Sequence, residues 1–336
     1  MLAGKKVLLT GLTGRIGAAI AERFAPTCEL WGLARYSAEG SLDAAKALGV
    51  IPVKGDYASG SLGELPADFD YVLHVAADVR PADAPSALVA NSDGPARLMK
   101  HCRNAKAFLH VSATGIYKQH PDPRFVYAET ADLGGAYGGQ YAPSKLAGEG
   151  AVRAAAIILD LPTVICRQNV QYGGPHVNAG LVDRFLDVFV ETGEAFLPPE
   201  GPLIIGAIHE DDICDLVEPC LGVASVPAET VNWGGDEIVD WQEMFEYAGQ
   251  LLGKTPRFTR KPEFAFPNCF PDTAKRMKIA GPCKVTWKEG VHLGSNFCHV
   301  KPPDEVGPRY TLDEVERSTS IMYLPPVVEL RYALHG

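Results

Sequence analysis

The chain has 336 residues, of which 46% are hydrophobic and 21% are charged, and its formal net charge is -10. This composition supports a large buried core, and the length favours one large α/β unit with a smaller appended lobe. The negative charge argues against a general nucleic-acid binder and against electrostatic docking on an anionic membrane. The chain also holds no apolar run of the roughly 20 residues that a membrane helix needs.

Strand-like and helix-like segments alternate along the first half of the chain. We expect strands at 6–10, 29–34, 50–53, 71–76, 107–112 and 163–167, and helices at 16–24, 42–48, 87–104 and 144–156. Strands that are separated by helix-sized segments form βαβ units with right-handed crossovers. The sequence therefore predicts an α/β fold with a Rossmann-type, doubly wound parallel sheet.

The pattern changes after Gln171, where a segment rich in glycine and proline follows. We expect an amphipathic helix at 181–190, a return to the sheet at 208–216 and 230–233, and a helix at 241–252. These features predict a dinucleotide-binding domain at 1–170, completed by about 205–235. A smaller C-terminal substrate lobe and tail would comprise 171–204 and 236–336. The pattern places no element after about residue 302.

The eight cysteines are scattered and include no CxxC pair. This usage is typical of reduced thiols. Together with an N-terminus that runs into a strand without a signal-peptide pattern, it predicts a cytoplasmic protein. Cys298 and His299 lie near Cys283 and Cys269, but their spacing fits no standard zinc pattern, so we expect no metal site.

A glycine-rich loop, GLTGRIG, follows the first predicted strand and precedes the first helix. Gly11 permits the tight turn, Gly14 lets the backbone approach a pyrophosphate, and Gly17 lets the helix pack closely on the strand. The N-terminus of the helix then offers free N–H groups to phosphates. In this position the loop predicts a dinucleotide site.

The end of the second strand normally selects between NAD and NADP. No acidic residue stands there, whereas Arg35 does, and Arg15 of the glycine loop is expected to face the same phosphate. Two arginines without a carboxylate favour NADP, with NAD as the alternative. Arg35 is alternatively a solvated surface residue. Asp56 is either a partner of the adenine amino group or a turn residue.

Tyr141 and Lys145 are four residues apart at the start of a predicted helix, so both side chains share one face. A free tyrosine has a pKa of about 10 and is a poor acid or base near neutral pH. A nearby ammonium and a nicotinamide cation would lower that pKa toward a useful range. The pair is therefore a candidate catalytic acid/base with its supporting cation.

In the order and spacing of its motifs, the chain resembles the NAD-dependent epimerase/dehydratase family, also called the extended short-chain dehydrogenase/reductases. The resemblance covers about residues 5 to 250. It rests on GLTGRIG, Asp56, HVAA at 74–77, VANSDGPARLMKHC, VSATGIY at 111–117, YAPSK, RQNVQYGGP and IHEDDI. It implies that Tyr141 is the acid/base and that Lys145 positions the cofactor ribose. The candidate cofactor-binding residues are Gly11, Thr13, Gly14, Arg15, Ile16, Gly17, Arg35, Asp56, Tyr57, Val75, Ala76, Ala77, Asn91, Lys145, Gln168, Asn169 and Val170.

Two departures from the family pattern concern the segment after the fifth strand. The family usually has Ser or Thr where this chain has Ala113, and either Ser112 or Thr114 is the candidate substitute. Ser112 alternatively only bonds the backbone. Dehydratases of the family carry an acidic pair here, and Thr114-Gly115 provides no carboxylate, which argues against dehydration.

Three functions remain open at this point. The first is an NAD(P)-dependent oxidoreductase that moves hydride between the cofactor and a carbonyl/alcohol substrate. The second is an epimerase of a sugar or sugar nucleotide that works through a transient ketone. The third is a cofactor-binding scaffold that has lost its chemistry. The expected partner is a small-molecule substrate, and a homodimer is left open.

The substrate is hardly readable from the sequence. The resemblance places Asp78–Arg80, His176 and His209 near the cleft, although His209 is better explained as a structural residue. Core packing is the better interpretation for the aromatic residues of the lobe, namely Trp241, Phe264, Phe266 and Phe270.

Overall fold

The computed structural model describes residues 1–293 except 136, 174–179, 263 and 265. The helices are α1 (Arg15–Phe24), α2 (Ser41–Ala47), α3 (Ala84–Leu88), α4 (Gly94–His101), α5 (Tyr141–Leu159), α6 (Leu181–Thr192), α7 (Glu210–Leu221), α8 (Trp241–Leu252), α9 (Ala274–Ala280) and α10 (Trp287–Leu293). None of these helices is long and apolar enough to serve as a transmembrane span.

A seven-stranded sheet forms the centre of the fold, in the order β12-β7-β5-β4-β1-β2-β3. All its pairings are parallel. Its strands are β1 (Lys6–Thr10), β2 (Glu29–Ala34), β3 (Ile51–Lys54), β4 (Tyr71–His74), β5 (Ala107–Ala113), β7 (Thr163–Gln168) and β12 (Glu229–Trp233). The order reverses between β1 and β4, which is the point where ligands bind in such sheets. The predicted Rossmann-type fold is confirmed.

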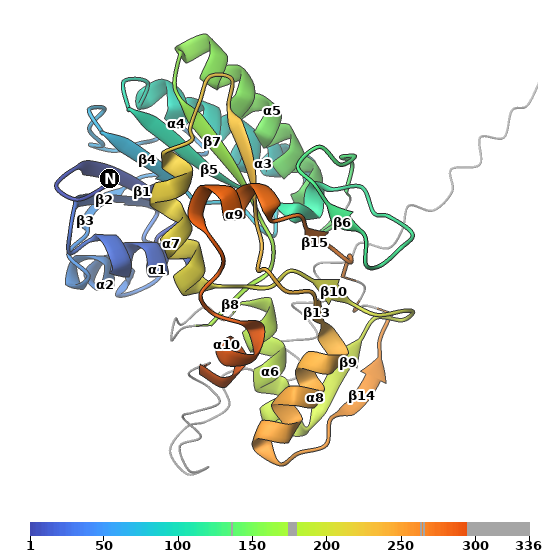
Figure 1. The fold of residues 1–336 in the computed structure, drawn as a ribbon. Helices are drawn as coiled ribbons and strands as arrows, with labels where there is room; N and C mark the ends of the chain where they lie inside the picture. Colours follow the sequence, from blue (N-terminus) through green and yellow to red (C-terminus); the bar gives the residue numbers. More distant parts are fainter. Residues whose placement is uncertain (136, 174–179, 263, 265, 294–336) are drawn as a thin grey trace, which may run out of the picture.

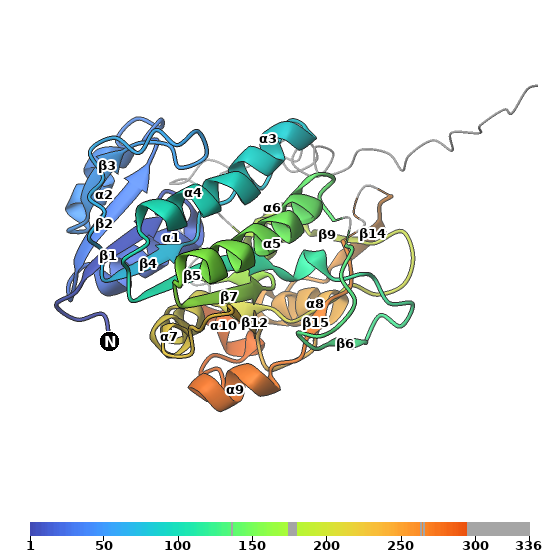
Figure 2. The same cartoon turned by 90° about the horizontal axis from the view of Figure 1, so that it is seen from above.

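The alternation of side chains along the strands builds an apolar core on each face of the sheet. Leu109 and Val111 of β5 join the core under α1 and α7, whereas Phe108 joins the core under α4 and α5. Figure 2 shows α4 and α5 on one side of the sheet and α7 on the other. The sheet is therefore covered on both faces, as its nearly continuous hydrophobic strands require.

The smaller lobe has an apolar core of its own below the sheet (Figure 1). Phe185 of α6 stands edge-on to Trp241 of α8 at 5.8 Å and to Phe264 at 4.9 Å. The core is bordered by short strand pairs, β9 (Glu194–Leu197) with β14 (Arg257–Arg260) and β10 (Ile204–Ile205) with β13 (Val239–Asp240). Elsewhere, β8 (Gln171–Tyr172) pairs with β11 (Ile208–His209), and β6 (Val126–Tyr127) pairs with β15 (Phe270–Pro271). The aromatic residues Trp241, Phe264 and Phe266 are buried in this core.

Two predicted elements differ from the structure. The segment 208–216, expected as a strand, is mostly α7. Its acidic first turn follows His209, which caps the helix by accepting a hydrogen bond from the Asp211 N–H, and both features favour a helix start. The predicted helix 87–104 is instead three joined pieces, because a π-helical turn at Val89–Asp93 separates α3 from α4. The tail after about residue 302 lies outside the described residues.

Candidate active site

The glycine loop lies between β1 and α1, at the edge of the sheet where its order reverses. Gly11 has φ +79°, and a Cβ there would meet the Ala76 backbone N at 2.7 Å. A Cβ on Gly17 would meet the Gly11 carbonyl oxygen at 2.2 Å. These close approaches require glycine and bring the loop against the segment that follows β4.

The N-terminus of α1 is suited to an anion. Its N-cap, Gly14, makes no side-chain capping bond within the described chain, and its first turn holds no acidic residue. Backbone N–H groups at such a helix end carry a partial positive charge and need acceptors. The loop thus fits the diphosphate of a dinucleotide. The N–H groups of Arg15 and Ile16 would hold it, whereas the Gly14 N–H donates to the Gly11 carbonyl at 2.9 Å.

Arg15 does not lie where a reader of the 2′-phosphate would lie. Its side chain is 5% exposed, and Nη1 lies 2.8 Å from Asp183 Oδ2, while Nε lies 3.6 Å from Glu210 Oε2. Burial raises the pKa of Asp183, although the Arg15 charge opposes that shift. Arg15 therefore joins the glycine loop to α6 and α7, and its predicted role in choosing NADP loses its structural basis.

Arg35 is exposed just after β2, as the NADP interpretation requires. It lies near Tyr57, since its charge opposes the burial that raises the pKa of that phenol. Tyr57 packs edge-on against the ring of His74 at 5.0 Å. One carboxylate oxygen of Asp56 accepts a hydrogen bond from the Ala58 N–H at 3.0 Å, so Asp56 at least shapes a turn.

Asn91 joins the segment after β4 to α5 from within the π-helical turn. Its Oδ1 accepts from the Asp78 N–H at 2.8 Å, and its Nδ2 donates to the Asp78 carbonyl at 2.9 Å and to Ser144 Oγ at 3.0 Å. A Cβ on Gly148 would meet the Asn91 carbonyl oxygen at 2.1 Å, so α5 approaches this turn closely. Asn91 thus holds the backbone of Asp78, the residue that follows Val75, Ala76 and Ala77.

Tyr141 and Lys145 lie one turn apart at the start of α5, next to the end of β5. The Lys145 ammonium is buried and donates to the Val111 carbonyl at 2.7 Å. Burial lowers the pKa of Lys145 to about 8, against the opposing charge of Glu149. Burial raises the pKa of Tyr141 to about 12, so the protein alone does not provide the lowering that an acid/base near neutral pH needs.

The two candidate hydroxyls beside Ala113 differ in their bonding. Thr114 Oγ1 accepts from Asn169 Nδ2 at 2.8 Å and donates to the Gln168 carbonyl at 3.3 Å. Ser112 Oγ is buried and has no hydrogen-bond partner among the described residues. Thr114 therefore has a structural role in the geometry, and Ser112 is the hydroxyl that is not already bonded.

The segment after β7 is organised by Asn169. Besides its bond to Thr114, its Nδ2 donates to the Cys269 carbonyl at 3.0 Å, and its Oδ1 accepts from the Gly206 N–H at 3.1 Å. Gln168 bonds Gln171 at 3.2 Å, and Val170 packs on the lobe core. These bonds place 168–170 at the junction of the sheet and the lobe, and both polar atoms of the Asn169 side chain are used in them.

The remaining candidates divide into structural and undescribed residues. His209 caps α7 and stands edge-on to Tyr172, which supports its structural interpretation. Arg80 contributes its backbone N–H to the Asp78 carboxylate in a local turn. His176 lies outside the described residues.

Sequence reasoning missed a buried histidine pair next to Lys145. His74 and His110 are register partners on β4 and β5, and their rings stack at 5.3 Å. Both side chains are fully buried. Their signal in the sequence was available, since each histidine interrupts an otherwise apolar strand in an equivalent position.

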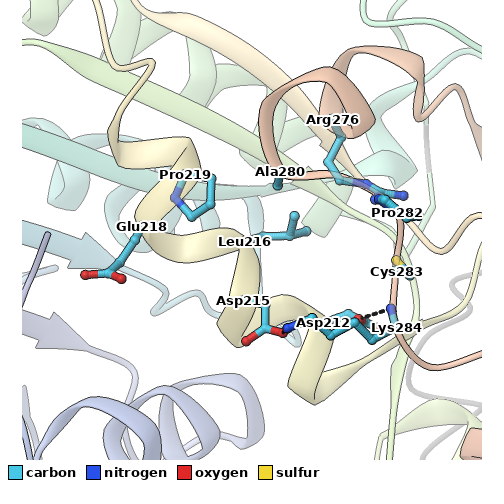
Figure 3. A pocket seen from close by; sticks show the side chains of 10 residues that line it. All are labelled: Asp212, Asp215, Leu216, Glu218, Pro219, Arg276, Ala280, Pro282, Cys283 and Lys284. Carbon is cyan, nitrogen blue, oxygen red and sulfur yellow. Dashed lines mark hydrogen bonds and ion pairs between the residues drawn. The ribbon is translucent and has the colours of Figure 1, made fainter.

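A pocket of about 450 Å³ lies elsewhere, between α7 and the chain around α9 (Figure 3). Asp212 accepts the Lys284 N–H at 2.7 Å, and Asp215 is paired with the Lys284 ammonium at 2.6 Å. Its lining includes no residue of the glycine loop and neither Tyr141 nor Lys145. Its carboxylates serve the packing of α7, and the pocket does not belong to the site above.

Comparison with known proteins gives one family and many similar folds. The model of the NAD dependent epimerase/dehydratase family matches residues 7–202. UDP-glucuronic acid 4-epimerase from Bacillus cereus, solved with UDP-glucuronic acid and NAD, is 18% identical with a TM-score of 0.73, covering 87% of this chain and 98% of that one.

Two further solved structures show the same fold. A putative epimerase from Burkholderia cenocepacia J2315 is 22% identical with a TM-score of 0.71, covering 87% of this chain and 97% of that one. UDP-N-acetylglucosamine 4-epimerase from Methanobrevibacter ruminantium M1, in complex with UDP-N-acetylmuramic acid, is 18% identical with a TM-score of 0.73, covering 88% and 99%. No curated protein sequence matches the chain.

Proposed function

The chain belongs to the NAD dependent epimerase/dehydratase family, and on that premise we propose that it is an NAD-dependent epimerase of a sugar or sugar nucleotide. The observation that carries the proposal is the placement of Tyr141 and Lys145 on one face of α5, beside the end of β5 and the cofactor-binding edge of the sheet. The segment Thr114-Gly115 has no carboxylate, which argues against dehydration.

When bound, the dinucleotide supplies a nicotinamide ring that accepts a hydride and returns it. The residues of the chain have three tasks around it. As the phenolate, Tyr141 would take the proton of the substrate hydroxyl and, as the phenol, would return it to the oxygen of the transient ketone, whose opposite face receives the hydride. The Lys145 ammonium would hold the ribose and, together with the nicotinamide cation, would lower the pKa of Tyr141 from its raised value. The uncapped N-terminus of α1 holds the diphosphate.

The Arg15–Asp183 pair supports epimerisation over net oxidoreduction. An epimerase returns its hydride within one turnover, so its cofactor need not leave between turnovers. The buried pair ties the glycine loop to α6 of the lobe. Solved relatives of the same fold that are named as epimerases contain NAD, which also favours this reaction.

An NADP-dependent reductase or dehydrogenase is the second candidate. Arg35 favours it, because this exposed guanidinium stands just after β2 where no carboxylate is available for a ribose diol. Because Arg15 is paired with Asp183, the preference for NADP depends on Arg35 alone. We therefore place NAD first and NADP second.

The experiment that separates the two candidates begins with the nucleotide that copurifies with the protein. An epimerase is expected to release NAD on denaturation and to interconvert a UDP-sugar without net change in NADH absorbance. UDP-glucuronic acid, UDP-glucose and UDP-N-acetylglucosamine form the first panel, followed by NMR in deuterated water. No deuterium is expected at the inverted carbon. Release of NADP, or steady consumption of NADPH with a carbonyl substrate, would establish the reductase instead.

The Tyr141→Phe variant tests the assignment of the acid/base. It keeps the ring and its packing but loses the ionisable hydroxyl, so turnover should fall by about 10²–10⁴-fold while NAD affinity is unchanged. A variant that retains more than about a tenth of the rate would remove Tyr141 from this role and favour the scaffold hypothesis.

The domain division at about residue 170, a cytoplasmic location and a homodimer remain part of the proposal. The seven described cysteines, all free thiols, support a reducing compartment. Ile157 and Ile158 at the end of α5 are 58% and 80% exposed and support a second copy as partner. Light scattering tests the dimer, since Ile158→Glu should then yield a monomer.

A further inference from the structure

His74 and His110 form a stacked pair in the core beneath α5. Their rings are 5.3 Å apart and nearly parallel, with an interplanar angle of 18°. Phe108, two residues before His110 on the same strand face, lies 5.9 Å from the His74 ring. Lys145 reaches the same place from α5, because its ammonium bonds the carbonyl of Val111, the residue after His110.

Polar atoms around this pair lack partners. Both ring nitrogens of His110, Nε2 of His74 and Oγ of Ser112 are buried and have no hydrogen-bond partner among the described residues. His74 Nδ1 alone is satisfied, by Thr10 Oγ1 at 2.8 Å. Such atoms are rare in folded proteins because burying them without a bond is unfavourable. An apolar side chain at position 110 would be the cheaper choice for stability alone.

The electrostatic surroundings keep both imidazoles neutral. Burial and then the charge of Lys145 lower the pKa of His74 to about 3 and that of His110 well below its ordinary value. A neutral imidazole still carries a strong dipole and a lone pair. It can therefore favour a neighbouring cation without adding a competing charge.

The other ionisable groups around the pair are few. On the α5 side, Glu149 is paired with Arg167 of β7 at 2.8 Å, and the Glu149 charge raises the pKa of Lys145. On the β4 side, Tyr57 packs on His74, with Asp56, Asp78 and Arg35 near its phenol. Among these groups, Lys145 is the cation whose charge lowers the pKa of both histidines, and its side chain is buried.

We propose that His110, with His74 and Ser112, is a positioning residue that keeps the buried Lys145 ammonium protonated by supplying neutral polar atoms in place of water. The proposal rests on the proposed function, in which Lys145 must be charged to hold the cofactor ribose and to act on Tyr141. The proposal gives a role to the buried ring nitrogens and the Ser112 hydroxyl oxygen, which lack hydrogen-bond partners among the described residues.

The test measures NADH affinity by fluorescence titration of the full-length protein between pH 6 and pH 10. In the wild type, affinity should fall as the pH rises through the pKa of Lys145, because a lysine is charged only below its pKa. Lys145→Met should lack this pH dependence. His110→Phe, which keeps a ring but removes the polar atoms, should move the midpoint down by about one pH unit or more.

Three further variants control for structure. Phe108→Leu alters packing beside His74 on the same strand face and should leave the midpoint unchanged. His110→Gln, which restores polar atoms, should return the midpoint toward that of the wild type. Ser112→Ala should move it in the same direction as His110→Phe, by less. His110→Phe should also melt at the same or a higher temperature, because unsatisfied polar atoms are removed.

The outcomes separate the two proposals. Suppose that the NADH affinity of the wild type changes with pH and that Lys145→Met abolishes this dependence. If His110→Phe and Ser112→Ala then leave the midpoint of the dependence unchanged, only the role of His110 is refuted. If Lys145→Met retains the pH dependence, the assignment of Lys145 in the proposed function fails and this inference falls with it. If His110→Phe does not fold, His110→Leu and Ser112→Ala carry the same test.

Discussion

Replacing Arg15 with methionine should destabilise the protein far more than replacing a surface arginine. Methionine keeps most of the side-chain length and apolar stem but removes the charge. The Asp183 carboxylate, whose side chain is 13% exposed, then remains in the interior without its cation at 2.8 Å. Breaking a buried pair in this way costs about 3–5 kcal/mol, because the surviving charge is left uncompensated.

Arg23→Met is the matched control. Arg23 pairs with Asp215 at 2.7 Å and with Asp211 at 3.2 Å, distances similar to that of Arg15, but its side chain is 42% exposed. Solvent screens such pairs, so the expected loss is only about 0–1 kcal/mol. Urea denaturation followed by circular dichroism gives both free energies of unfolding from midpoints and slopes.

The pH dependence sharpens the comparison. Asp183 already has a raised pKa in the folded protein, and removing Arg15 takes away the charge that opposed this shift. A carboxyl group with a raised folded pKa contributes stability when protonated and loses it as the pH rises through that pKa. The deficit of Arg15→Met should therefore shrink on acidification, and Asp183→Asn should rescue it in part. Equal losses for Arg15→Met and Arg23→Met at pH 7 would refute the buried ion pair as a link between loop and lobe.

The remaining predictions concern the cofactor, the hydroxyls and the packing of α5. Arg35→Asp should weaken NADPH binding by about 1.5–3 kcal/mol and spare NADH, as measured by titration of both; equal losses would show that Arg35 does not read the phosphate. Thr114→Val should lower the free energy of unfolding by about 1–3 kcal/mol with little change in kcat, because it removes a buried hydrogen bond. Ala113→Ser should raise kcat by up to about 10²-fold if the site lacks a hydrogen-bond donor at position 113. Unchanged kcat in Ala113→Ser would mean that the substrate oxygen lies elsewhere. Gly148→Ala should destabilise by about 1–3 kcal/mol in urea denaturation, because its Cβ would meet the backbone oxygen of Asn91 at 2.1 Å.

Strands of the sheet were predictable because each is a short apolar run between turn residues. β1 and β2 match their predicted bounds, and β12 returns to the sheet as expected. The helix at α7 was misjudged because Ile208 and His209 do begin as a strand before the acidic turn starts the helix. A run of apolar residues cannot by itself distinguish a buried strand from a buried helix.

The candidate site was predictable only where backbone geometry fixes the residue type. Gly11 and Gly17 are required by close approaches that the spacing of the loop already implied. The partners of Arg15 and Thr114 were not predictable, because Asp183 and Asn169 lie far away in the sequence and meet them only in the folded chain. Long-range polar contacts leave no periodic signal, and the partner of a charged side chain decides its role.

The bonds of Asn169 have a mechanical consequence. Segments 169–170, 206–207 and 234–238 are three of the segments that carry the chain between the sheet and the lobe. The Asn169 N–H donates to the carbonyl of Trp233, the residue just before the third segment, and Asn169 Oδ1 accepts from the Gly206 N–H. The Gly235 N–H donates to the Gly206 carbonyl, so the three segments lie side by side. Because these three segments are hydrogen-bonded to one another, none of them can bend independently of the other two. We expect these segments to move together, and the end of β5 is tied to them through the bond between Thr114 and Asn169.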